Sequence, residues 1–231
     1  MKHTIEYQPT FALLRVTLDP GDVLTAEAGA MVTRQGHVGM HTRMNTDRKA
    51  GFFGKVWMLL ICLVRKLVGG ETFFVNDFSA PTPGEVTFAP TMSGNILHKR
   101  LDGQSLLVQN GAFLASSGDV RMKLRWGGLR TLFAREGLFL LELSGTGDLW
   151  FTSYGGVVPI PVDGSFIVDT GHMVAFDASL DFEIKTPGGG IMGFVASGEG
   201  LVCEFKGKGT VYMQSRNVSA LTGWLQPYLG G

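Results

Sequence analysis

The side chains best suited to chemistry are few and lie far apart in this 231-residue sequence. His37 and His41 can share one face of a strand, as two imidazole ligands of a metal ion would, but no third ligand is indicated by position. Cys62 and Cys203 lack the short CxxC spacing of a redox pair or a zinc site. We therefore expect a non-enzymatic protein with no catalytic residue, no metal and no cofactor, and with two buried, reduced thiols.

A glycine string near the carboxyl end matches a nucleotide-binding pattern. Gly188, Gly190 and Gly193 satisfy GxGxxG, whose glycines form a phosphate-binding turn between a strand and a helix. Pro187 precedes this string, and the residues after it, 194–198 (FVASG), are not typical of a helix. The string therefore predicts a hairpin turn and no dinucleotide cofactor.

Three glutamates recur next to glycine. Glu71, Glu136 and Glu199 each stand at the same place in a repeated string. We interpret them as structural acids that accept backbone N–H bonds where strands begin. The alternative is a site of three carboxylates on a pseudo-axis.

These strings belong to longer blocks that occur three times. Residues 136–153 resemble residues 199–215, offset by 63 at the glutamate and by 62 at the second glycine, with a looser copy at 71–88. Residues 111–124 resemble residues 171–184 at an offset of 60, with a first copy at 29–40. Self-similarity of this kind indicates one supersecondary unit used repeatedly.

The repeated blocks alternate apolar and polar residues, which is typical of half-buried strands. Glycine, at 33 of 231 residues, is about twice as frequent as average and separates these blocks. With 45% hydrophobic and 17% charged residues, a disordered chain is excluded. We predict an all-β fold, a glycine-rich antiparallel β-sandwich or jelly-roll-like structure whose edges are hidden by closure as a sandwich, prism or barrel. It forms one domain, 1–231, of three pseudo-repeats at about 1–80, 81–143 and 144–216.

The first pseudo-repeat carries an insertion at 51–68 that is predicted to be helical. Its helix is apolar over most of its surface and has one basic stripe, so it must be covered by its own domain, a partner subunit or a lipid interface. The predicted interaction residues are Phe52, Phe53, Lys55, Val56, Trp57, Leu60, Val64 and Lys66.

A second, short helix is predicted at 218–226. Asn217 or Ser219 can cap it, and Pro227 stops it. The longest apolar run in the chain, 56–64, is nine residues, whereas a membrane span needs about 20. With no secretory signal recognised at 1–16, we expect a cytoplasmic protein, with peripheral membrane association as the alternative.

Several strings resemble one known family, among them 21–31 (GDVLTAEAGAM), 69–74 (GGETFF), 171–177 (GHMVAFD) and 197–201 (SGEGL). Together they are similar to the altered-inheritance-of-mitochondria family, type twenty-four, over about residues 6–217. The resemblance implies a fold like that of the tryptophan-operon RNA-binding attenuation protein (TRAP-like). For the fungal relatives it implies a role in mitochondrial inner-membrane organisation. It supplies no catalytic residues.

The function predicted from the sequence is a self-assembling scaffold or protein-interaction module, with a homo-oligomer expected and no specific protein partner indicated. One alternative is a membrane-organising protein that uses the insertion. The other is an RNA- or small-ligand-binding module with Lys206, Lys208, Tyr212 and Arg216 as a basic–aromatic patch. A net charge of zero makes nucleic acid the less favoured partner.

Overall fold

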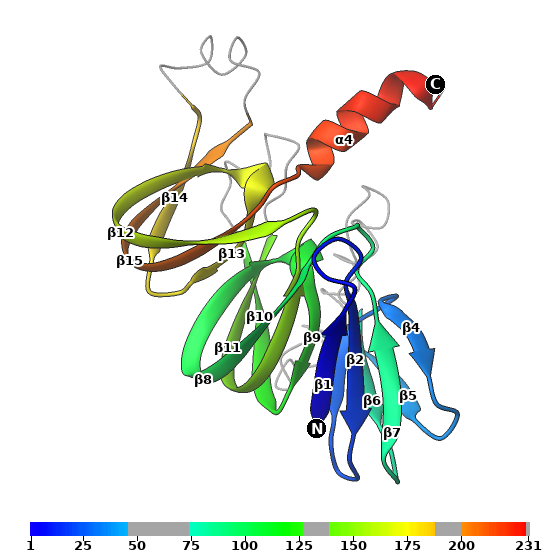
Figure 1. The fold of residues 1–231 in the computed structure, drawn as a ribbon. Coiled ribbons are helices and arrows are strands. Elements are labelled where there is room, and N and C mark those ends of the chain that lie inside the picture. Colours follow the sequence, from blue (N-terminus) through cyan, green and yellow to red (C-terminus); the bar gives the residue numbers. More distant parts are fainter. Residues whose placement is uncertain (46–73, 127–138, 188–199, 230–231) are drawn as a thin grey trace, which may run out of the picture.

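The computed structural model describes residues 1–45, 74–126, 139–187 and 200–229, and antiparallel strands dominate them (Figure 1). This confirms the predicted all-β class. The predicted insertion at 51–68 and the GxGxxG turn lie outside the described residues.

The strands fall into three groups in chain order. The first group holds β1 (Lys2–Glu6), β2 (Leu13–Leu18), β3 (Leu24–Glu27), β4 (Met31–Arg34), β5 (Gly39–Met44), β6 (Phe74–Ser79) and β7 (Gly84–Phe88). The second holds β8 (Ile96–Gln109), β9 (Phe113–Ser117), β10 (Asp119–Trp126) and β11 (Phe139–Thr152). The third holds β12 (Val157–Asp169), β13 (Met173–Asp177), β14 (Asp181–Lys185) and β15 (Val202–Gln214). The predicted division between residues 143 and 144 falls inside β11.

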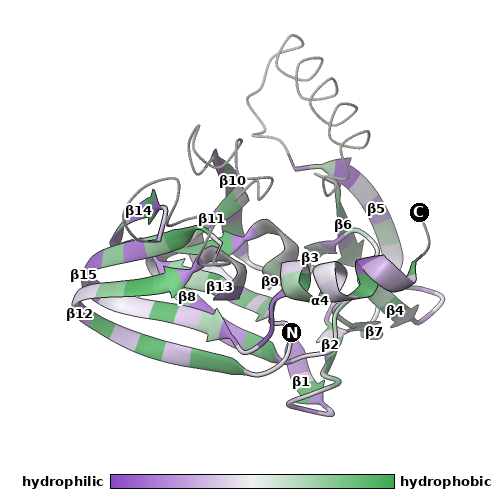
Figure 2. Cartoon of the chain, turned by 90° about the horizontal axis from the view of Figure 1, so that it is seen from above, coloured by the Kyte–Doolittle hydropathy of each residue, from purple (hydrophilic) through white to green (hydrophobic). Residues whose placement is uncertain are grey.

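The strands form two sheets. The smaller has the order β1-β2-β7-β4, and the larger runs β12-β15-β13-β8-β11-β9-β3-β6-β5, with β10 paired to β11 and β14 to β15. The ends of the larger path, β12 and β5, do not pair with each other, so the described strands do not close into a barrel. The strand groups instead stand in an open row, with β12 at one end and β4 at the other (Figures 1 and 2).

Long hairpins organise the second and third groups. β8 pairs with β11, and β12 with β15, along almost their whole lengths. Gly145 in β11 and Gly207 in β15 have φ of 116° and 111°. Such values suit glycine, and the pairing register of β11 shifts between Ser144 and Thr146, around Gly145.

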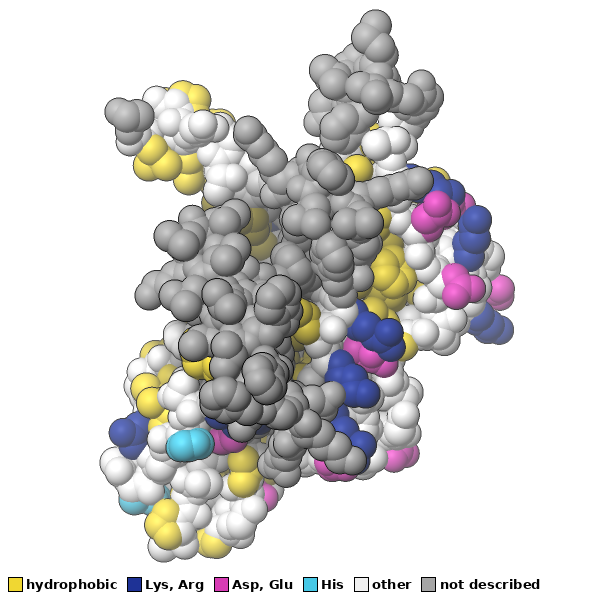
Figure 3. Space-filling model, turned by 180° about the vertical axis from the view of Figure 1, so that it is seen from behind, with side chains coloured by type: hydrophobic (Ala, Val, Ile, Leu, Met, Phe, Trp, Pro, Cys, Tyr) yellow, Lys and Arg dark blue, Asp and Glu magenta, His cyan; other side chains and the backbone are white. Residues whose placement is uncertain are grey.

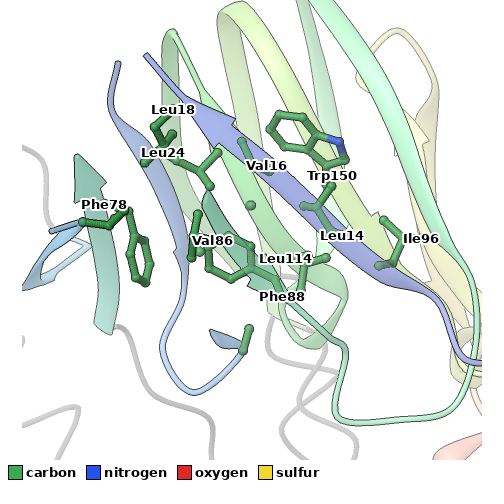
Figure 4. Close-up of a cluster of buried hydrophobic side chains, with 14 of the residues drawn as sticks. Leu14, Val16, Leu18, Leu24, Phe78, Val86, Phe88, Ile96, Leu114 and Trp150 are labelled. Carbon is green, nitrogen blue, oxygen red and sulfur yellow. The ribbon is translucent and has the colours of Figure 1, made fainter. Parts of the chain in front are cut away.

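Alternating side chains build the interior, and the change of hydropathy along β12 and β15 is visible in Figure 2. One buried cluster lies within the first group but includes Ile96, Leu114 and Trp150 of the second (Figure 4). Another includes Leu101 and Val108 of the second group with Val174 of the third. Neighbouring groups therefore share their cores.

The predicted carboxyl-terminal helix is confirmed as α4 (Val218–Leu225). Asn217 Oδ1 accepts a hydrogen bond from Ala220 N at 3.2 Å, which makes Asn217 the cap. A 3-10 turn, Gln226–Tyr228, ends the helix and contains Pro227. No helix among the described residues is long and apolar enough to cross a membrane.

At Gly147, the backbone of β11 lies very close to the turn between β9 and β10. A Cβ at Gly147 would lie 1.9 Å from the Ser117 carbonyl oxygen, whereas a Cβ at Gly36 would meet nothing within 4 Å. We expect Gly147→Ala to lower the free energy of unfolding by about 3 kcal/mol, because a backbone atom must move, and Gly36→Ala to leave it nearly unchanged. Urea denaturation measures both, and equal midpoints would contradict the packing described.

Candidate interaction surfaces

The predicted interaction residues of the insertion and the three recurring structural glutamates lie outside the described ranges. This holds for the eight residues of the insertion, from Phe52 to Lys66, and for the recurring Glu71, Glu136 and Glu199. Their roles stay predictions, and the candidate surfaces must be built from other side chains.

The two histidines with metal-like spacing have separate surroundings. His37 Nε2 lies 3.1 Å from the Pro83 carbonyl oxygen, and His41 is exposed on β5. Within the described ranges no group of three histidine, cysteine or acidic residues could hold a metal ion.

Cys203 lies in the core of the third group beside residues such as Phe205 and Val211. Burial in this apolar surrounding raises the pKa of its thiol to about 12. The thiolate is the nucleophilic form of cysteine, so Cys203 is unsuited to nucleophilic chemistry near neutral pH.

Two lysines of the predicted basic–aromatic patch lie close to acidic side chains. Lys206 Nζ lies 3.6 Å from Glu204 Oε1, and Lys208 Nζ lies 4.0 Å from Asp163 Oδ2. Positive and negative side chains alternate in the same way on the face seen in Figure 3. The structure therefore shows paired charges here in place of a basic stripe.

Tyr212, the aromatic member of that patch, belongs to the junction between the second and third groups. Its hydroxyl lies 3.2 Å from Lys99 Nζ, which also donates to Asp177 Oδ1 at 2.8 Å. Burial opposes the charge on Lys99, but the hydrogen bonds to Asp177 and Tyr212 raise its pKa. The edge of the Tyr212 ring also meets the Phe151 ring, with centroids 5.3 Å apart. These contacts fasten β8 to β13 and β15.

A polar cluster on β8, β9 and β11 contains a serine, a histidine and an aspartate, the residue types of a hydrolase triad, but they are arranged differently. Asp148 receives hydrogen bonds from His98 Nε2 at 2.8 Å and Arg100 Nη1 at 2.9 Å, and Ser117 Oγ lies 3.4 Å away. Burial opposes the ionised carboxyl, yet these donors hold the pKa of Asp148 below its usual value. Because Asp148 lies between Ser117 and His98, the imidazole cannot take the serine proton as it would in a catalytic triad.

An aromatic stack covers this cluster on one side. The His3 ring of β1 lies 4.4 Å from the His98 ring and 5.0 Å from the buried Trp150 ring, measured between centroids. Burial, and secondarily the neighbouring His98, lower the pKa of His3, although Asp148 acts in the opposite direction. The sequence gives no signal for this contact, because it depends on β1 and β8 facing each other across the fold.

An exposed apolar surface lies on α4 and the 3-10 turn that follows it, and α4 projects from the sheets (Figures 1 and 3). No residue of α4 is buried, and Trp224, Tyr228 and Leu229 are largely exposed. The ring centroids of Trp224 and Tyr228 are 5.5 Å apart, so the two side chains form one aromatic surface. Periodicity predicted this helix but not that it stands away from the core.

The base of α4 is firmly attached to the third group. Gln214 donates to the Gly171 carbonyl at 2.9 Å and accepts from Tyr154 N at 2.8 Å. A Cβ at Gly171 would lie 2.2 Å from Asn217 Nδ2, so the capping residue packs directly on the Gly171 backbone. This contact fixes where the aromatic surface begins.

Comparison with known proteins identifies the family. The model of the family described as Mitochondrial biogenesis AIM24 matches residues 3–216. The chain belongs to this family. The resemblance found in its glycine–acid strings is thereby confirmed.

Two relatives match this chain over nearly its whole length. An uncharacterized protein of Streptococcus pyogenes serotype M6 is 31% identical over 99% of this chain and 91% of its own length. The crystal structure of a Streptococcus pyogenes protein, determined in a structural genomics programme, superimposes with a TM-score of 0.80 at 29% identity. That match covers 98% of this chain and 99% of the Streptococcus chain. Neither relative carries a description of its activity.

The lowered pKa of His3 predicts a loss of stability in mild acid. Below the pKa of about 6.5 of an unfolded histidine, the unfolded chain binds a proton that folded His3 resists, so the free energy of unfolding falls as pH decreases. We expect the urea midpoint to drop between about pH 7.5 and pH 5.5, and His3→Gln to make this drop smaller. His41→Gln, at an exposed position, is the control. An unchanged drop in His3→Gln would show that another group causes it.

The buried thiol predicts slow chemical modification. In a Cys62→Ser background, Cys203 is the remaining cysteine. Its raised pKa lowers the thiolate fraction at about pH 8 on the order of a thousandfold. We expect Ellman's reagent to react with it only after urea unfolding, and rapid labelling of the folded variant would contradict the burial described.

Proposed function

We propose that this protein is a non-enzymatic scaffold that assembles with further copies of itself. The observation that carries this proposal is the ordered but uncovered surface of α4. Trp224 and Tyr228 are the residue types that contribute most to protein interfaces, and here they are exposed side by side. Residues 218–229 contain no charged side chain, so the surface suits an apolar contact.

The polar clusters support a structural role. Asp148 is shared among His98, Arg100 and Ser117, and Asp177 binds Lys99 and the Thr210 amide. The first cluster joins β8, β9 and β11 within the second group, and the second joins β8 of the second group to β13 and β15 of the third. Their donors and acceptors are occupied by one another, which favours fastening over proton transfer to a substrate.

The membrane alternative depends on the insertion at 51–68, outside the described residues, and stays a prediction. The RNA alternative has less support, because the two lysines face acids and Tyr212 contacts Lys99 and Phe151.

Sedimentation velocity over a range of micromolar concentrations tests self-assembly. We expect species larger than a monomer, and we expect the double variant Trp224→Ser, Tyr228→Ser to weaken association by about 10-fold or more, since both side chains are interface anchors. The fold of the single chain should be kept, because neither side chain is buried. Val23→Ser, at another exposed apolar residue, is the matched control. A wild-type chain that stays monomeric at every concentration would overturn the proposal.

A further inference from the structure

The three strand groups are joined by one kind of contact that occurs twice. A strand of one group pairs with the short strand that follows the first long strand of the next group: β3 with β9, and β8 with β13. The facing pairs are Leu24–Ser117, Thr25–Ser116 and Ala26–Ala115 at the first junction, and Leu106–Asp177, Leu107–Phe176 and Val108–Ala175 at the second. The two junctions therefore have the same length and the same antiparallel register.

Each short strand also carries the same irregularity. β9 and β13 skip one residue in their pairing with β11 and β15, at Leu114 and Val174. Both of these side chains are completely buried, and each lies in the core shared with the preceding group. The skipped residue is thus the apolar anchor of each junction.

β4 is the corresponding strand of the first group. Its pairing with β7 skips Val32, between the pairs Met31–Phe88 and Thr33–Thr87. β4 has no second neighbouring strand in the part of the chain that the structure describes. Val32 is consequently 53% exposed where Leu114 and Val174 are fully buried.

At the opposite end of the row, β12 has a strand edge that is unpaired among the described strands. Residues 166–168 of β12 occupy the position that residues 106–108 hold in β8, since the matching blocks differ by 60. Among the described strands β12 pairs only with β15. Ile167 is 58% exposed, whereas its counterpart Leu107, covered by β13, is 9% exposed.

The rest of this edge is less suited to pairing. Pro159 and Pro161 lie in the first half of β12 and have no N–H to donate. Proline on an edge strand discourages the addition of another strand. Residues 166–168 contain no proline and so form the open part of the edge.

We propose that β4 of one copy pairs antiparallel with residues 166–168 of a second copy, repeating between chains the junction that occurs twice within each chain. This rests on the self-assembly proposed above and adds to the aromatic surface of Trp224 and Tyr228 a second contact between copies. The register places Thr33 opposite Val168 and Arg34 opposite Ile167, and Val32 enters the core of the third group of the neighbour. β4 and β12 lie at opposite ends of the molecule (Figures 1 and 2), so the contact is head-to-tail and forms rings or filaments.

Two single variants block one end each. Val32→Asp places a charge on the β4 anchor, and Ile167→Arg places a cation opposite Arg34 on the β12 edge. Both positions are exposed in the single chain, so the fold should be kept. Val158→Asp, at a 49% exposed residue in the proline-containing half of β12, is the matched control.

Sedimentation velocity of the full chain then separates the outcomes. We expect each blocked variant to have an association constant lower by about 10-fold or more, and the control variant to behave like the wild type. An equimolar mixture of the two blocked variants should form a heterodimer through the intact ends. The double variant Arg34→Glu, Ile167→Arg should associate again, since opposite charges face each other. A monomeric wild type would overturn both this contact and the scaffold. An associating wild type whose association is unaffected by either variant, or a mixture that forms no heterodimer, would overturn the contact and leave the scaffold standing.

Discussion

The fold depends on one constraint: no strand group can complete its core alone. The core of the first group needs Leu114 and Trp150 from the second, and the core of the second needs Val174 from the third. Each of these side chains comes from a strand that also forms backbone hydrogen bonds across or beside the junction. Apolar burial and sheet pairing therefore favour the same relative placement of the groups, which is how a chain of short strands acquires one continuous interior.

The polar contacts follow from this arrangement. The His98–Asp148–Arg100 cluster and the Lys99–Asp177–Tyr212 cluster lie beside the first and second junctions. Each is built on an aspartate paired with basic side chains, Asp148 in β11 in the first and Asp177 in β13 in the second.

Much of the local structure could be predicted from the sequence. Alternation in segments such as 181–185 indicated strands, Asn217 and Pro227 bounded the last helix, and the glycine–acid strings indicated the family. What could not be predicted depends on distant pairing. His3 meets His98, and β2 pairs with β7 some seventy residues later, with Leu14 opposite Phe88. The exposure of Trp224 could not be predicted either, because apolar periodicity indicates that a helix has an apolar face but does not indicate what covers that face.

The shared cores have a consequence for synthesis. Ribosomes deliver the chain from its amino end, and the first strand group ends at residue 88. Its interior also requires Ile96, Leu114 and Trp150, which are translated later. The amino-terminal third of the nascent polypeptide therefore remains without its complete hydrophobic interior until Trp150 has emerged from the exit tunnel. Apolar strands that stay exposed in this way during synthesis are prone to aggregation.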